Sequence, residues 1–308
     1  MSNLKDFQIE NGVLIKYSGE ELIVSIPNCV VELSDLCFAG IDMEEIIVPS
    51  TVEKISEVAF IETPNLKRIV VDSANATYCS IDGCLYSKDK KKFILSPNRT
   101  DTLNIAEGCE MISPYAFFQR KVAGIIFPKT LKCFEHSALC NCYIDADELI
   151  IPDIKFDGGE WFNATILPQR VVVEGVKTLE NGVFAFSSFG AMRLPNTLTE
   201  IGDWSFYNSN MRRVYVTKTV TKIGKNVFAI DGPIQSAETE EEYYGEEYDW
   251  YGDENQVEEV VESVENFIPC PAGFLLGVDN EKCAAAKYAR EHNIPYEVVA
   301  DVDAFLKG

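Results

Sequence analysis

The chain has 308 residues, of which 46% are hydrophobic and 25% are charged, so most of it can bury a core. Its formal net charge of −22 excludes a general binder of nucleic acid or of anionic membranes, because the phosphate field would repel it. No run of about 18 apolar residues occurs, which excludes insertion of a helix through a membrane. Residues 1–10 lack the apolar stretch of a secretory signal, and ten cysteines then favour a reducing compartment. We expect a cytoplasmic protein; the alternative is a secreted or cell-surface protein whose leader has been removed.

An internal repeat organises residues 26–230, after a short N-terminal cap at residues 1–25. One large apolar residue recurs at steps of 22 or 23 residues, except for a step of 57. This column consists of Phe38, Phe60, Phe117, Leu139, Phe162, Phe184, Phe206 and Phe228. Each unit supplies a short strand, a turn and a compact segment that carries the large residue. Because one unit cannot bury its apolar face alone, the eight units are expected to stack into a solenoid with one continuous core.

The long step contains an insertion at residues 72–102. Its centre reads Ile81-Asp82-Gly83-Cys84, and Asp-Gly is a strong signal for a two-residue hairpin turn because both residues tolerate a positive φ. We therefore predict a β-hairpin there. Cys79 and Cys84 are not directly opposed across such a turn, which argues against a disulfide between them.

A second insertion, residues 231–265, carries 14 acidic residues and no lysine or arginine. Like-charge repulsion and the absence of aliphatic periodicity predict a loop. Five aromatic residues are interleaved with the acids: Tyr243, Tyr244, Tyr248, Trp250 and Tyr251. Aromatic faces accept cations and carboxylates attract them, so this acidic aromatic loop is predicted to bind a lysine- and arginine-rich surface. That surface belongs either to another protein or to the hairpin tip at residues 88–92.

The repeat resembles the BspA-like leucine-rich repeats of bacterial and protist proteins. The resemblance rests on the pattern Ile-Pro-x-x-Val-x-x-Ile-x-x-x-Ala-Phe, present here from Val48-Pro49 to Ala59-Phe60, and on the hairpin insertion. It extends to the C-terminal end, where Cys270-Pro271-Ala272-Gly273 and the segment Cys283–Tyr296 are similar to the terminal strand, helix and final strand of that family. It implies an α/β solenoid of the leucine-rich-repeat type, with short parallel strands and a helix–strand cap at residues 266–308. It also implies a binding or adhesion surface.

Residues typical of catalysis or metal binding form no convincing site. There is no Gly-rich phosphate loop, no His-Glu-x-x-His and no Gly-x-Ser-x-Gly motif. The spacing of Cys133, His136, Cys140 and Cys142 is compatible with zinc, but Cys133 shares an outward column of the repeat with Glu32 and Lys54. We therefore expect no enzyme activity, no metal and no cofactor; an enzyme built on the solenoid is the least favoured alternative.

The outer side of the predicted strands is mostly aliphatic. Side chains alternate across a strand, so the residue two places before the proline position points away from the core. In this column the candidate protein-binding residues are Ile47, Val70, Ile126, Ile150, Val171 and Tyr215. Two interpretations remain open: the side chains stabilise the sheet by stacking on one another, or they contact a partner. We favour a non-enzymatic protein-interaction scaffold, with a surface adhesin or a host- or matrix-binding protein as the alternative.

Overall fold

Backbone hydrogen bonds join each turn of the chain to the next. The computed structural model describes residues 4–156, 161–231 and 267–307. Phe38 N–H donates to the carbonyl of Ala59 at 3.2 Å, and Phe206 N–H donates to that of Val227 at 2.9 Å. Because the neighbouring repeat satisfies these peptide groups, the segment around each phenylalanine forms stacked turns rather than a helix. In the described residues the expected α/β solenoid is therefore mostly strand, with helices only near its two ends.

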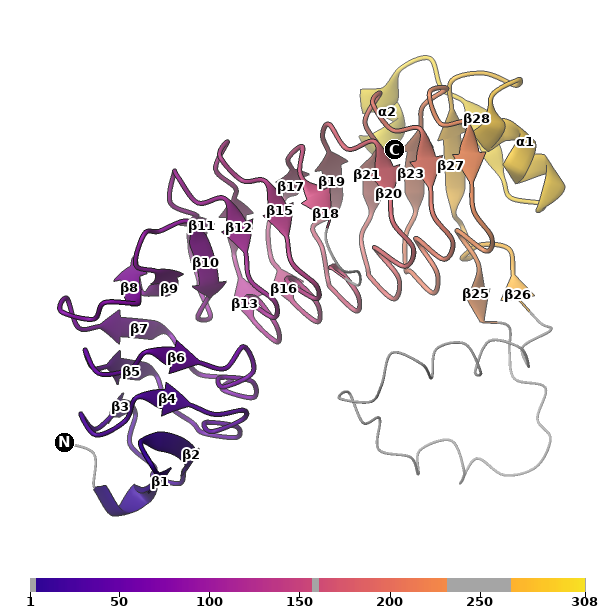
Figure 1. The fold of residues 1–308 in the computed structure, drawn as a ribbon. Helices are drawn as coiled ribbons and strands as arrows, with labels where there is room; N and C mark the ends of the chain where they lie inside the picture. The colour runs from indigo at the N-terminus through magenta and orange to yellow at the C-terminus, as the bar shows by residue number, and fades with distance from the viewer. Residues whose placement is uncertain (1–3, 157–160, 232–266, 308) are drawn as a thin grey trace, which may run out of the picture.

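One set of parallel strands follows one side of the solenoid, in one direction before the hairpin insertion and in another after it, and we call this set the strand row (Figure 1). Three sheets form it in the orders β3-β5-β7, β11-β14 and β17-β19-β21-β23-β27-β28, and all these pairings are parallel. The strands are β3 (Ile23–Ser25), β5 (Glu45–Val48), β7 (Arg68–Val71), β11 (Thr102–Asn104), β14 (Gly124–Ile126), β17 (Glu148–Ile151), β19 (Arg170–Val173), β21 (Ala191–Arg193), β23 (Arg213–Val216), β27 (Leu275–Val278) and β28 (Tyr296–Val298).

The remaining strands, many of them only two residues long, close the other sides of each turn. One set pairs in the orders β1-β2-β4-β6, β18-β15-β12-β10-β9-β8 and β20-β22-β24. It comprises β1 (Phe7–Glu10), β2 (Val13–Tyr17), β4 (Glu32–Leu33), β6 (Lys54–Ile55), β8 (Tyr78–Ile81), β9 (Cys84–Ser87), β10 (Lys92–Leu95), β12 (Met111–Ile112), β15 (Cys133–Phe134), β18 (Lys155–Phe156), β20 (Thr178–Leu179), β22 (Glu200–Ile201) and β24 (Lys222–Ile223). The other set comprises the pairs β13 (Lys121–Val122) with β16 (Tyr143–Ile144), and β25 (Ile230–Asp231) with β26 (Phe267–Ile268).

The column of large apolar residues lies in the core, as the sequence predicts, and its rings stack from repeat to repeat. Phe184 and Phe206 have centroids 5.4 Å apart with planes at 6°, and Phe206 and Phe228 are 5.5 Å apart at 11°. A similar stack joins Phe38 to Phe60 at 5.3 Å. Face-to-face offset rings at this spacing bury large apolar areas and fix the distance between turns.

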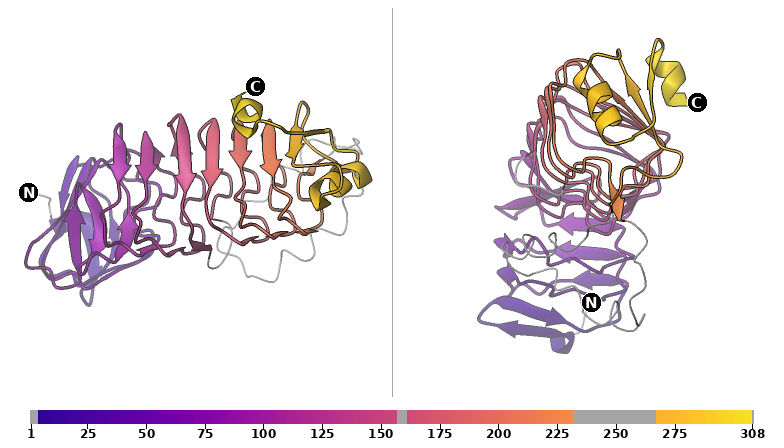
Figure 2. Two further views of the ribbon diagram at one scale, coloured as in Figure 1. Left: turned by 90° about the horizontal axis from the view of Figure 1, so that it is seen from above. Right: turned by 90° about the vertical axis from the view of Figure 1, so that its right-hand side faces the viewer.

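The predicted hairpin is present, and it divides the core in two. β8 and β9 pair in antiparallel orientation with Ile81 opposite Cys84, and Asp82 and Gly83 have φ values of 51° and 77°. On β9, Leu85 is buried in the cluster of the N-terminal repeats, whereas its neighbours Cys84 and Tyr86 are buried in the cluster of the C-terminal repeats. The strands on the two sides of this junction run in different directions (Figures 1 and 2), so the solenoid has a corner there.

The C-terminal end contains two helices. β27 is followed by α1 (Ala284–Glu291) and then by β28, which extends the strand row. α1 buries Ala285, Ala286 and Ala289 against the last repeat. The second helix, α2 (Val302–Lys307), was not expected from the sequence, and it packs against β21 and β23. At the N-terminal end, a 3-10 turn (Leu4–Asp6) precedes the hairpin of β1 and β2.

We predict that Phe206→Ala lowers the free energy of unfolding by about 3–5 kcal/mol, because the stacked neighbours cannot close the cavity. The matched control is Phe186→Ala. Phe186 is 51% exposed, so its loss is expected to cost about 0.5 kcal/mol or less. Urea unfolding of the three proteins measures both values, and equal losses would contradict the assignment of the column to the core.

Candidate protein-interaction surface

The outer face of the strand row carries exposed aliphatic side chains, as the strand alternation predicts. Ile126 on β14 is 56% exposed and Ile150 on β17 is 47% exposed. Ile47 on β5 and Val70 on β7 are half-buried on the same face, next to one another in the ladder. Four of the six strand residues proposed from sequence therefore face outward and can be reached by solvent.

The assignment of Val171 to this face is wrong. Its side chain is 0% exposed and belongs to the main core, and the ladder pairs Ile150 with Val172, not with Val171. No proline follows the three valines at 171–173. The position expected for proline from the aromatic column is therefore one residue too early, and the outer column is placed at Val171 instead of Val172. Because side chains alternate along a strand, a slip of one residue moves the side chain to the other face. Val172, which is half-buried, takes the place of Val171.

Tyr215 does face outward, but it is not exposed. It pairs with Arg193 on one side and Gly277 on the other, in the outer column, yet it is only 6% exposed. Phe305 and Leu306 of α2 cover it. The expectation that Tyr215 is open to a partner is therefore wrong, because a segment far along the chain occupies its surroundings. The other proposed contacts, Tyr243, Tyr244, Tyr248, Trp250 and Tyr251, lie outside the described residues.

Arginines accompany the aliphatic residues towards the C-terminal end of this face. Arg170 on β19 pairs with Glu148 at 2.9 Å, and Arg193 on β21 is exposed between Val172 and Tyr215. The Arg213 guanidinium on β23 lies over the Phe305 ring, 5.7 Å from its centroid. The outer face thus changes from aliphatic on β14 and β17 to cationic on the next three strands.

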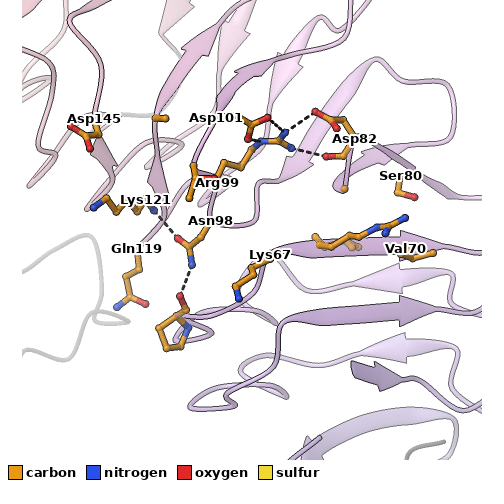
Figure 3. A pocket seen from close by; sticks show the side chains of 16 residues that line it. Lys67, Val70, Ser80, Asp82, Asn98, Arg99, Asp101, Gln119, Lys121 and Asp145 are labelled. Atoms are coloured by element: carbon orange, nitrogen blue, oxygen red, sulfur yellow. Dashed lines mark hydrogen bonds and ion pairs between the residues drawn. The ribbon is translucent and has the colours of Figure 1, made fainter. Parts of the chain in front are cut away.

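A cleft of about 1050 Å³ opens at the corner, where β7 meets the hairpin and the segment before β11 (Figure 3). Val70 lines it, together with Lys67 and Lys121. Arg99 is held on its rim by Asp82 at 2.9 Å and by Asp101 at 2.8 Å. The hydrogen bonds from Arg99 lower the pKa of the Asp101 carboxyl, which therefore stays ionised at neutral pH.

A buried arginine links the two arms at this corner. Arg120 donates to the carbonyls of Thr63 at 2.6 Å and Phe60 at 2.8 Å, and to Thr63 Oγ1 at 2.9 Å. These acceptors belong to the last repeat before the hairpin, and Arg120 to the first repeat after it. Burial lowers the pKa of Arg120 to about 10, so it remains cationic at neutral pH. Asn98 adds a second link, because it donates to the Pro64 carbonyl and accepts the Lys121 N–H at 2.7 Å.

The cysteines and histidines do not assemble a metal site in the described residues. No group of three His, Cys, Asp or Glu side chains there could hold a metal ion. Cys140 and Cys142 are buried, Cys133 is half-buried on β15, and His136 is exposed. Cys79 lies opposite Tyr86, not opposite Cys84, and both cysteines are free thiols. None of the helices in residues 4–156, 161–231 and 267–307 is long and apolar enough to cross a membrane.

A family model described as "BspA type Leucine rich repeat region" matches residues 16–144 and 158–244 in six copies. The chain belongs to this family. The BspA-type repeat of 22 residues is thus shared by the two arms that meet at the corner, and the resemblance seen in the sequence is confirmed. No curated protein matches the chain.

Several solved structures of leucine-rich repeat proteins are similar to this BspA-type chain. One from Eubacterium ventriosum is 17% identical, with a TM-score of 0.44, and the match covers 68% of this chain and 72% of that one. The pneumococcal vaccine antigen PcpA is 18% identical, with a TM-score of 0.46, over 92% of this chain and 69% of the antigen. A leucine-rich repeat protein of T. pallidum is 21% identical, with a TM-score of 0.34, over 74% and 87%.

We predict that Arg120→Met lowers the free energy of unfolding of this BspA-type chain by about 2–4 kcal/mol. The substitution keeps the apolar bulk but removes three charge-assisted hydrogen bonds of about 1.5–3 kcal/mol each. It also removes the cost of burying the guanidinium, which offsets part of that loss. Arg193→Met is the matched control: its side chain is exposed, so a change of about 0.5 kcal/mol or less is expected. Urea unfolding followed by circular dichroism measures both variants, and a similar small loss at the two positions would contradict the role of Arg120 at the corner.

Proposed function

We propose that the chain is a non-enzymatic scaffold that binds a protein through the outer face of its strand row. The observation that carries the proposal is the exposure of Ile126 and Ile150 on that face. Large aliphatic side chains on neighbouring strands form more than scattered exposure, and such patches are typical of contact surfaces. Val172 on β19 is paired with Ile150 and extends this patch, half-buried, towards the C-terminal end. Ile47 and Val70 form a second half-buried pair on the other arm, across the corner. Membership of a repeat family whose members are typically protein-binding or surface proteins supports the proposal.

The proposal includes the acidic aromatic loop as an accessory contact for a basic surface on the partner. Its 14 acidic residues and five interleaved aromatics suit lysine and arginine side chains. The alternative dock within the chain, residues 88–92, joins β9 to β10, and two of its four lysines already pair with carboxylates. Lys92 pairs with Glu135 at 2.7 Å, and Lys91 with Glu110 at 3.3 Å. An external basic partner is therefore favoured.

A surface adhesin is the alternative form of the same function, because it would use the same face for a host or matrix protein. The two forms differ in where the partner is found. Protease treatment of intact source cells distinguishes them: an adhesin is cleaved, and an intracellular scaffold is protected. In either form, a metal or organic cofactor that co-purifies with the chain would instead favour an enzyme built on the solenoid.

We predict that a chain carrying both Ile126→Lys and Ile150→Lys folds normally but binds its partner at least tenfold more weakly. Exposed substitutions usually change stability by about 0.5 kcal/mol or less, whereas two charges in an apolar contact must be desolvated. The partner is first identified by cross-linking in source cells, and its affinity for the purified chain is then measured by titration calorimetry. The matched control is Ile166→Lys, because Ile166 is 48% exposed but lies outside the strand row. Equal affinities for the double variant and the control would contradict the proposed surface.

We predict that deletion of residues 238–254 weakens partner binding and reduces its dependence on salt. Exposed ion pairs are screened as ionic strength rises, so the loss should be large at about 50 mM NaCl and small at about 500 mM. Two further variants separate the contributions. Replacing the nine acids of this stretch with their amides should remove the salt dependence, whereas replacing its five aromatics with serine should keep it and lower the affinity. If the deletion changes neither affinity nor salt dependence, the loop has no part in binding.

A further inference from the structure

The C-terminal helix α2 occupies part of the proposed binding face. Phe305 and Leu306 are buried there against Ala191 and Tyr215, in an apolar cluster separate from the two solenoid cores. α2 packs on the outer side of β21 and β23 rather than at the end of the strand row (Figure 1). One segment of the chain, α2, is therefore already bound to this face. The contacts of α2 show which side chains can bind there.

The cluster contains a socket that fits one aromatic ring. Gly277, the neighbour of Tyr215 in the ladder, lies beneath Phe305, and a Cβ at this position would stand 2.7 Å from Cε1 of the ring. The absence of a side chain on Gly277 is thus what makes room for Phe305. The Arg213 guanidinium lies over the same ring, and Tyr215, whose hydroxyl donates to Asp279, forms one wall.

The attachment of α2 is slight compared with that of the strands beneath it. Buried Phe305 and Leu306 and partly buried Val302 hold it by apolar contact, with the Arg213 guanidinium over Phe305. An ion pair between Asp303 and Arg170 at 3.3 Å, with side chains 62% and 33% exposed, is added to these contacts. Residues 299–301 tether it to β28. The ladders that join β21, β23 and β27 do not depend on α2, so its release leaves the sheet intact. Release also uncovers Tyr215 beside the exposed Arg193, which lies between the socket and Val172 in the ladder.

We propose that α2 is an exchangeable occupant of this socket, and that the partner inserts a helical segment of the same chemistry, a Phe-Leu pair preceded by an acidic residue. The inference rests on the proposed function, of which it names the partner segment and the means of regulation. Because α2 is tethered, its effective concentration at the socket is high, on the order of millimolar. A partner segment must compete with it, and any condition that detaches α2 raises the apparent affinity for the partner.

The test uses a fluorescent peptide of residues 298–308 as the probe and full-length chains as receptors. The released receptor carries Phe305→Asp and Leu306→Asp. Its matched control carries Ala304→Asp, which adds a carboxylate on the exposed side of the same helix. We expect fluorescence anisotropy to show binding to the released receptor at least tenfold tighter than to the wild type or to the control. A peptide with aspartate in place of its own phenylalanine should not bind. Equal binding to all three receptors, or binding to none, would overturn the inference.

Two further measurements keep the test decisive if the released receptor is unstable. Gly277→Ala should detach α2 yet fail to bind the peptide, because the added Cβ excludes either ring. In the wild type, hydrogen exchange should be faster at the Phe305 N–H, which donates to Asp301, than along β23. Exchange as slow as in β23 would overturn the inference.

Failure of this inference differs in outcome from failure of the proposed function. If the peptide does not exchange with α2 but the paired lysine substitutions at Ile126 and Ile150 still abolish partner binding, the face is a contact surface and α2 is a fixed part of it. If the peptide exchanges and the lysine substitutions have no effect, the socket binds a segment and the aliphatic patch does not.

Discussion

The constant length of the repeat is the constraint on which the rest of the structure depends. Each turn donates its backbone N–H groups to the next turn and stacks its ring on the next ring, so both interactions require neighbours of nearly equal length. The strand row follows from this, because turns in register bring the corresponding strands of successive repeats together. Its outer face follows in turn, since alternation assigns one side of every strand to the core and the other to solvent.

The hairpin is the largest interruption of this regularity among the described repeats before β25. β9 separates the two clusters and presents successive side chains to each of them, so it belongs equally to both arms. The hydrogen bonds of Arg120 and Asn98 then fix the direction in which the second arm leaves. The corner cleft and the change of strand direction are thus consequences of one inserted hairpin and of the polar links across it, which also include the hydrogen bond from the Glu62 N–H to Gln119.

The features repeated along the chain were predictable from the sequence, and those made by distant segments were not. The phenylalanine column and the Asp82-Gly83 turn depend on residues close in sequence. Val171 was misplaced because no proline marks the end of its strand, although a count of 22 residues from Ile150 leads to Val172. No residue close to Tyr215 in the sequence indicates that α2 covers it, because the covering residue Phe305 lies 90 positions away and outside the repeat. Arg120 was missed for the same reason: its acceptors are contributed by another repeat.

The length of each arm and the angle at the corner depend on different residues. Because each repeat contacts only its neighbours, duplication of one unit within the second arm would lengthen that arm by one turn and leave the junction unchanged. The groups that determine the angle, Arg120 with Thr63 and Asn98 with Pro64, all lie within one repeat of the hairpin. Descendants of one ancestral sequence can therefore differ in the distance between the two ends of their strand rows while keeping the same angle at the corner.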